Sequence, residues 1–301
     1  MRKLQLKHSG TLLKTTCQKW FDRDPFRESA IIGYNSIFSL PGLLVVVITL
    51  AGYFFGAEAV NGRLHRQIAD AMGKDTADQI QEMVIMAHRS KDSVWAGIIA
   101  VVTIFIGATG VFVQMQKSLN NIWEVEATAK KSGFLHFLKT RLFSFGLIIS
   151  IAFLLLISLV LSSLLSALST WAQHHWSDSV LILFKIFNFI FSTAVITALF
   201  AMMFKILPDA KIKWNLVWMG ALITAILFIL GKEALGLYFG KANPGSGYGA
   251  AGSVILILLW TSYSSMIVFF GAEFTKVYAD HYYGEIPATE NAVKHHHPKE
   301  K

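Results

Sequence analysis

Polar residues at the start of the first long apolar segment are the clearest candidates for chemistry in this sequence. This group consists of Tyr34, Asn35, Ser36, Ser39 and Pro41. Asn35 and Ser39 are four residues apart, so a helix would place them on one face. Pro41 lacks a backbone N–H and predicts a kink in that helix. Hydrogen-bonding side chains beside a kink could line a cavity or could hold neighbouring helices together, and both interpretations stay open.

Glu273 is a second candidate because it directly follows an apolar segment that contains no charged residue. A carboxylate near hydrocarbon is costly, so we expect a cation on a neighbouring segment to neutralise it. The candidates for that cation are Arg27, Arg141 and Lys213. An ion-paired anchor is the favoured interpretation of Glu273, and a proton carrier is the alternative.

The usual catalytic and metal-binding motifs are absent from the sequence. Cys17 is the single cysteine, which excludes an intramolecular disulfide and a zinc site built on cysteines. There is no HExxH motif and no Gly-x-Ser-x-Gly motif, and Gly231-Lys232 lacks the other residues of a P-loop. The His295–His297 run lies in a polar tail, where it would not hold a defined coordination geometry. We therefore expect no enzymatic activity, no cofactor and no metal site.

The elements that must position these residues are six long apolar segments. The chain is 54% hydrophobic and only 15% charged, and its apolar residues are collected into blocks. A helix needs about 20 apolar residues to cross the hydrocarbon of a bilayer. The sequence thus predicts an all-α, polytopic membrane protein with about six transmembrane helices. The predicted spans are residues 30–56, 94–113, 142–169, 180–204, 214–239 and 250–272.

The distribution of Lys and Arg predicts the orientation of these spans. The first 29 residues and the alternate segments 117–141, 205–213 and 273–301 carry 19 of the 27 basic residues, whereas the other connecting segments carry six. The positive-inside rule therefore places both termini in the cytoplasm. On this basis residues 1–29 form a cytoplasmic segment, 30–278 the membrane domain, and 279–301 a cytoplasmic tail. The tail is polar, and we expect it to be mobile from about Ile286.

Amphipathic patterns occur in two of the connecting segments. Residues 57–93 have apolar residues at helical spacing on both sides of a turn, which predicts two short helices that cover the outer end of the bundle. In the N-terminal segment, Leu13, Thr16, Cys17, Trp20 and Phe21 form a stripe on a basic helix. Such a helix is expected to lie on an anionic membrane surface, so membrane lipid is a predicted partner and nucleic acid is not.

Four motifs in this order resemble the YihY/BrkB family of bacterial inner-membrane proteins. They are Phe38-Ser39-Leu40-Pro41; Gly110…Gln114…Gln116…Leu119-Asn120…Trp123; Leu207-Pro208-Asp209; and Tyr248-Gly249-Ala250…Gly252-Ser253…Leu259-Trp260…Gly271-Ala272-Glu273. Gly42 departs from the bulkier residue expected after the proline. The resemblance implies an inner-membrane location and six spans. Some members have carried the label ribonuclease BN, but no catalytic set that would support this label is present.

The leading functional hypothesis is transport or flipping of an amphipathic envelope molecule, such as a lipid, through a cavity among the spans. The alternative is a scaffold that organises partners in the envelope without transport. The residues expected to line the cavity combine the first-span group with polar residues of the family motifs: Tyr34, Asn35, Ser36, Ser39, Pro41, Gln114, Asn120, Tyr248 and Glu273. The sequence leaves the substrate, the coupling ion and the oligomeric state open.

Overall fold

The described part of the chain contains seven elements with defined bounds and two further helical stretches. The computed structural model describes residues 6–38, 61–62, 64–66, 68–69, 74–89, 110–127, 178–242, 244, 252–290 and 292–294. The helices are α1 (Leu6–Asp22), α4 (Lys74–Arg89), α7 (Asp178–Ile206), α8 (Trp214–Ala242) and α9 (Gly252–Tyr283), and the strands are β1 (Val125–Ala127) and β2 (Ala292–Lys294). Residues 25–38 and 110–122 are also helical and are called helix 25–38 and helix 110–122 below.

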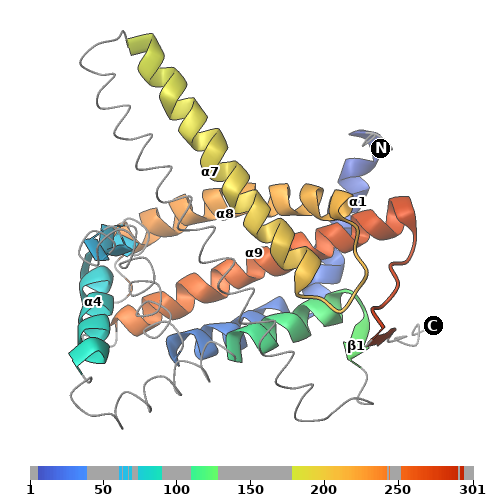
Figure 1. The fold of residues 1–301 in the computed structure, drawn as a ribbon, viewed down its shortest axis with the longest axis horizontal. Helices are drawn as coiled ribbons and strands as arrows, with labels where there is room; N and C mark the ends of the chain where they lie inside the picture. Colours follow the sequence, from blue (N-terminus) through green and yellow to red (C-terminus); the bar gives the residue numbers. More distant parts are fainter. Residues whose placement is uncertain are drawn as a thin grey trace.

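Three of these helices are long and apolar enough to cross a membrane. The qualifying stretches are Ile186–Ile206 in α7, Trp214–Phe239 in α8 and Val254–Tyr283 in α9. They correspond to the fourth, fifth and sixth predicted spans. The first three predicted spans lie wholly or largely outside the described residues, so the expected number of six is not confirmed. Figure 1 shows α8 and α9 running along each other, while one end of α7 projects away from them. Phe187, Phe189 and Ile190 on α7 are all more than half exposed, as expected of side chains that face lipid.

The crossing of α8 and α9 is formed by a reciprocal pair of glycine and threonine residues. Thr275 of α9 lies against Gly220 of α8, and Thr224 of α8 lies against Gly271 of α9. A Cβ added at either glycine would lie 1.7 Å from the opposing threonine Oγ1, so only glycine fits at both positions. Each threonine also donates a hydrogen bond of 2.7 Å to the carbonyl four residues earlier in its own helix. Small residues at four-residue spacing thus allow the two backbones to approach closely.

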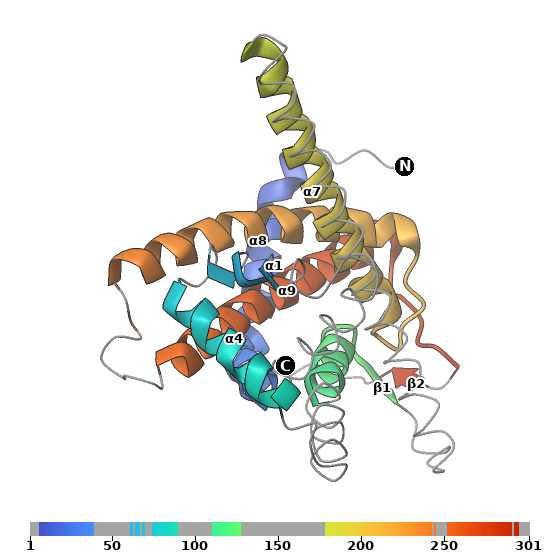
Figure 2. The same ribbon diagram turned by 60° about the vertical axis from the view of Figure 1, so that its left-hand side comes forward.

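Helices 25–38 and 110–122 lie beside α9 and close to each other (Figures 1 and 2). Helix 25–38 begins at Pro25, where the fixed φ and the missing N–H of proline suit the first helical position. Asp24, just before it, has a φ of 49°, and the turn there separates α1 from helix 25–38. Gly33 packs close to Ser262 of α9, and Gly110 packs close to the side chain of Asn35. The first predicted span therefore begins as a helix held between two neighbours.

Helix α4 is one of the two helices expected between residues 57 and 93, and it packs against α9. Its Ile80 is buried in a small cluster with Phe239 of α8 and with Leu256 and Ile257 of α9. His65 Nε2 lies 2.6 Å from Asp78 Oδ1, which connects the helical stretch near residue 65 to α4. The amphipathic helix α4 therefore covers the end of the bundle where α8 ends and α9 begins.

The tail and the N-terminal helix differ from the expectations. β2 pairs antiparallel with β1, with Glu126 opposite Val293, so a two-stranded sheet is added to the predicted all-α fold. Ile286 is buried, and Thr289 donates its N–H to the carbonyl of Asp209 at 2.9 Å. The expectation of a mobile tail from Ile286 is thus wrong for residues 286–290 and 292–294, because backbone hydrogen bonds and an apolar contact hold them.

The membrane-facing stripe predicted for the N-terminal segment is also only partly right. Leu13 and Phe21 of α1 are exposed, as expected, but Thr16 is buried. Leu12, which lies outside the predicted stripe, is buried with it. Helix α1 packs against α9, so its polar Thr16 faces protein and satisfies its hydroxyl by donating to the carbonyl of Leu12 at 2.8 Å.

Candidate functional site

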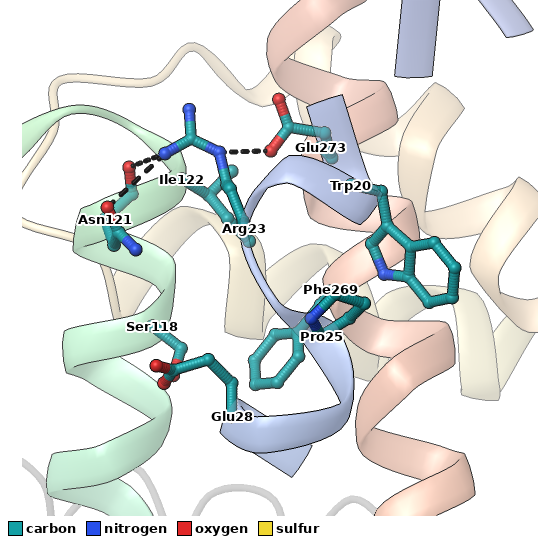
Figure 3. Close-up of a pocket in the computed structure, with 9 residues that line it drawn as sticks. All are labelled: Trp20, Arg23, Pro25, Glu28, Ser118, Asn121, Ile122, Phe269 and Glu273. Atoms are coloured by element: carbon teal, nitrogen blue, oxygen red, sulfur yellow. Dashed lines mark hydrogen bonds and ion pairs between the residues drawn. The ribbon is translucent and has the colours of Figure 1, made fainter. Parts of the chain in front are cut away.

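Arg23 connects three segments at one end of the bundle. Its Nε donates to Glu273 Oε2 at 2.8 Å, and its Nη2 lies 3.2 Å from Glu124 Oε1. Its Nη1 donates to the carbonyl oxygen of Asn121 at 2.6 Å. Figure 3 shows the guanidinium between helix 110–122 and α9. This junction joins the N-terminal segment to two helices that are distant from it in sequence. We call it the Arg23 cluster, and its members are Arg23, Asn121, Glu124, Glu273, Lys276 and Asp280.

Glu124 occupies a backbone position that few residues adopt, with a φ of 53°. Its Oε1 accepts a hydrogen bond of 2.7 Å from Lys276 Nζ. Lys276 is buried and also lies 3.4 Å from Asp280 Oδ2. Burial by itself would raise the pKa of Glu124, but the hydrogen bond from Lys276 and the positive charges of Lys276, Arg23 and Lys19 outweigh it and lower the pKa. The carboxylate of Glu124 is therefore held in its charged form.

A second carboxylate, Glu28, joins helix 25–38 to helix 110–122. Glu28 Oε2 accepts hydrogen bonds from Gln114 Nε2 at 2.8 Å and from Ser118 Oγ at 2.7 Å. Gln114 and Ser118 are four residues apart and so lie on one helix face. We call Glu28, Asn35, Gln114, Ser118 and Ser262 the polar seam, because these polar residues lie where helix 25–38 meets helix 110–122 and α9.

Asp209 fixes the connection between α7 and α8 to helix 110–122. Asn120 Nδ2 donates to Asp209 Oδ2 at 2.8 Å, and the backbone N–H of Asp209 donates to Asn120 Oδ1, also at 2.8 Å. Gln116 adds a longer bond of 3.3 Å to the same carboxylate. A reciprocal pair of this kind requires both the side chain and the backbone of Asp209, so it fixes the orientation of the connection.

A small cavity lies between the Arg23 cluster and the polar seam (Figure 3). Its volume is about 10 Å³, which is about the space of one water molecule. Arg23, Glu28, Ser118 and Glu273 are among the residues that line it, together with Trp20. Glu273 Oε1 and Trp20 Nε1 are buried, and neither has a hydrogen-bond partner among the described residues. Both polar and apolar side chains thus line the cavity, and two of the lining residues, Glu273 and Trp20, each have one polar atom without a partner among the described residues.

The structure distributes the expected cavity residues over different environments. Tyr34 is 62% exposed and contacts Phe38 edge-on. Asn35 and Ser36 donate hydrogen bonds to carbonyls four residues earlier, those of Ile31 and Ile32. Ser39, Pro41 and Tyr248 lie outside the described residues. The remaining three, Gln114, Asn120 and Glu273, each take part in the polar contacts described above.

Among the described residues, the cation in contact with Glu273 is Arg23, which was not among the expected partners; of those, Arg141 lies outside the described residues. Arg27 is four residues further on, but its side chain is 69% exposed and lies near Glu28. Arg23 directly follows α1, which packs against α9, whereas Arg27 lies in the helix that begins after the turn at Asp24. Sequence reasoning also missed Glu124, Lys276 and Glu28. The only signal for them was their position next to the ends of apolar segments.

No group of three or more His, Cys, Asp or Glu residues that could hold a metal ion occurs within the described ranges. The acidic residues of this region are instead bound to Arg, Lys, Gln, Asn and Ser side chains. The arrangement can hold helices in fixed positions, and its cavity has room for about one water molecule.

Comparisons with known proteins place the chain among bacterial membrane proteins. A family model described as Virulence factor BrkB matches residues 16–296. A UPF0761 membrane protein of Saccharophagus degradans is 26% identical over 261 residues, which cover 85% of this chain but 57% of the relative. Another from Pseudoalteromonas atlantica is 25% identical over 253 residues, covering 82% of this chain and 78% of the relative. No solved structure matches the chain significantly. The family model covers most of the chain and includes all three long apolar helices, and the chain therefore belongs to the BrkB family of membrane proteins.

Proposed function

We propose that this protein transports or flips an amphipathic envelope molecule across the bacterial inner membrane, with the polar seam as the polar side of its path. The observation that carries the proposal is that helix 25–38 makes two polar contacts with helix 110–122, one at Glu28 and one at Asn35. Glu28 and Asn35 are seven residues apart, which is about 10 Å along a helix, and each lies at the contact with helix 110–122. Polar side chains in apolar helices are costly, and they commonly mark substrate pathways.

The local geometry near Asn35 supports a path that can open. Gly110 faces the carboxamide of Asn35, and a Cβ at Gly110 would lie 2.8 Å from Asn35 Oδ1. On the other side, Gly33 faces Ser262, whose Oγ would be 2.7 Å from an added Cβ. Glycines and polar side chains thus meet here, with Leu258 beside Gly33, and separating the helices exposes hydrogen-bonding groups to a polar head group.

We further propose how the protein is oriented in the membrane and which class of molecule it contacts. Both termini face the cytoplasm, as the excess of Lys and Arg on alternate segments predicts. The protein acts without catalysis and without nucleic acid, and anionic lipid is its partner at the cytoplasmic surface. No nucleotide-binding motif occurs in the sequence, so transport is passive, coupled to an ion or driven by a partner.

Transfer of a fluorescent phospholipid between the leaflets of proteoliposomes tests this function. We expect the protein to accelerate transfer over empty vesicles, and Asn35→Leu to remove most of the acceleration because it replaces a polar group of the path. Thr193→Val is the matched control, since the Thr193 hydroxyl bonds only to the Phe189 carbonyl of its own helix among the contacts described. Transfer at the rate of empty vesicles contradicts the proposal.

The alternative is a scaffold without transport, and one observation favours it. The carboxylates of Glu28, Glu124 and Asp209 are all bound to neighbouring segments, which describes a rigid junction. A scaffold predicts that Asn35→Leu and Ser39→Ala leave envelope integrity unchanged in cells. It further predicts that changes in residues 57–93 abolish it.

A further inference from the structure

A groove between α1 and the end of α9 lies beside the Arg23 cluster and has no role in the polar seam. Its volume is about 310 Å³, at the lower end of the range of about 300–1,000 Å³ that is typical of small-molecule sites. Four residues of α1 and three of α9 line it: Thr11, Leu12, Thr15, Lys19, Val277, Asp280 and His281.

The lining combines an apolar floor with groups of both charges. Leu12 and Val277 are buried and form the apolar part. Lys19 contributes an ammonium group and Asp280 a carboxylate whose side chain is 30% exposed. Thr11 and Thr15 add hydroxyls that can donate hydrogen bonds. A ligand that satisfies this lining carries a negative group and a positive group within one small unit.

The position of the groove indicates where such a ligand comes from. Val277, Asp280 and His281 lie in the last two turns of the apolar stretch Val254–Tyr283, which is the depth at which lipid head groups are found. On α1, Leu13 is 50% exposed and Phe21 is 59% exposed, so the helix also presents apolar side chains to surrounding acyl chains, on a face other than that of the groove. Helix α1 therefore offers contacts both to head groups and to acyl chains.

We propose that this groove binds the head group of a phospholipid that carries a phosphate and a primary ammonium group. Lys19 and the Thr15 hydroxyl bind the phosphate, and Asp280 binds the ammonium. Charge-assisted hydrogen bonds of these kinds are short and strong, and the primary ammonium supplies N–H groups that a quaternary ammonium lacks. The bound lipid holds α1 at the membrane surface. This site requires no transport activity, so it can be tested independently of the proposed function.

Thermal unfolding of the purified protein in detergent, measured during titration with defined lipids, tests the site. We expect phosphatidylethanolamine to raise the unfolding temperature at lower concentration than phosphatidylcholine or phosphatidylglycerol. Lys19→Gln should weaken the apparent affinity for phosphatidylethanolamine about tenfold, the size expected for losing a hydrogen bond to a charged group. Asp280→Asn should reduce the preference over phosphatidylcholine. Lys14→Gln is the matched control, because Lys14 is an exposed lysine of α1 outside the groove, and it should bind as the unmodified protein does.

Each variant is compared with its own lipid-free unfolding temperature, since Lys19 also contributes to the electrostatics of Glu124. Thr15→Val is a second test variant, which removes a hydroxyl of the groove but no charge. It should weaken the binding of phosphatidylethanolamine. Equal affinities for phosphatidylethanolamine and phosphatidylcholine would overturn the proposal, as would equal effects of Lys19→Gln and Lys14→Gln. Stabilisation by soluble phosphoethanolamine at the same concentrations as the lipid would also overturn it, because the ligand would then not be a membrane lipid.

Discussion

The carboxylate of Glu273 has no solvent exposure, and it depends on the guanidinium of Arg23 for its charge partner. Arg23 is 17% exposed, so the pair is largely removed from water. Such pairs contribute little relative to apolar residues of the same size, but the loss of one partner leaves a buried charge uncompensated. At the residue scale, Arg23 is therefore important for the stability of the fold. A count of basic residues near the ends of the spans would not single it out.

Arg23→Gln is expected to lower the free energy of unfolding by about 3–5 kcal/mol, because it removes the cation in direct contact with the buried carboxylate of Glu273. Denaturation with dodecyl sulfate in mixed micelles measures this change. Arg27→Gln is the control: Arg27 is 69% exposed and lies 3.4 Å from Glu28, and surface pairs of this kind contribute at most about 1 kcal/mol. Glu273→Gln in the Arg23→Gln background should recover part of the loss. Equal effects of the two single arginine changes would contradict the role of Arg23.

At the scale of elements, the contacts of α9 with α1 and with α8 have different origins. The contact of α1 with α9 depends on a mixed polar and apolar face, whereas that of α8 with α9 depends on the absence of side chains at Gly220 and Gly271. In lipid there is no hydrophobic force to bring helices together, so close packing of small residues supplies the association. The four-residue spacing of Gly220 with Thr224 and of Gly271 with Thr275 is visible in the sequence, but it does not reveal which helices pair.

Gly220→Ala is expected to destabilise the protein by about 1–3 kcal/mol, the usual cost of overpacking, because the new Cβ would overlap Thr275 Oγ1. Thermal unfolding in detergent measures the loss. Thr275→Ala in the same chain removes the overlapping oxygen and should restore part of the stability. Gly10→Ala is the control, since nothing lies within 4 Å of a Cβ at Gly10. A Gly220→Ala variant as stable as Gly10→Ala would show that the close crossing is not needed.

At the scale of the whole molecule, four segments distant in sequence meet at one end. They are the end of α1 at Arg23, the turn at Glu124, the connection at Asp209 and the tail at Thr289. These belong to the same alternate segments that carry most of the basic residues. The other end of α9 carries α4, so the two ends of the bundle differ in both charge and architecture (Figure 2).

Cysteine labelling tests the proposed orientation. In a Cys17→Ser background, Glu290→Cys should react with a membrane-impermeant maleimide only in inverted membrane vesicles. Glu82→Cys should react in intact spheroplasts, because it lies in α4 at the opposite end of the bundle. Both glutamates are exposed, so reactivity reports the side of the membrane rather than burial. Labelling of Glu290→Cys from outside would contradict the placement of the tail in the cytoplasm.

The sequence by itself determined that α7, α8 and α9 are long apolar helices, because the preference of a segment for hydrocarbon depends only on its own residues. It also identified Gln114, Asn120 and Glu273 as polar residues next to apolar segments. Only the tertiary structure decided their partners. Arg23 and Glu273 are 250 residues apart, so their pairing depends on the turn at Asp24 and on how α1 packs against α9. The pairing of β2 with β1 was equally invisible, since three-residue strands have no pattern of their own and form only when the fold brings their backbones together.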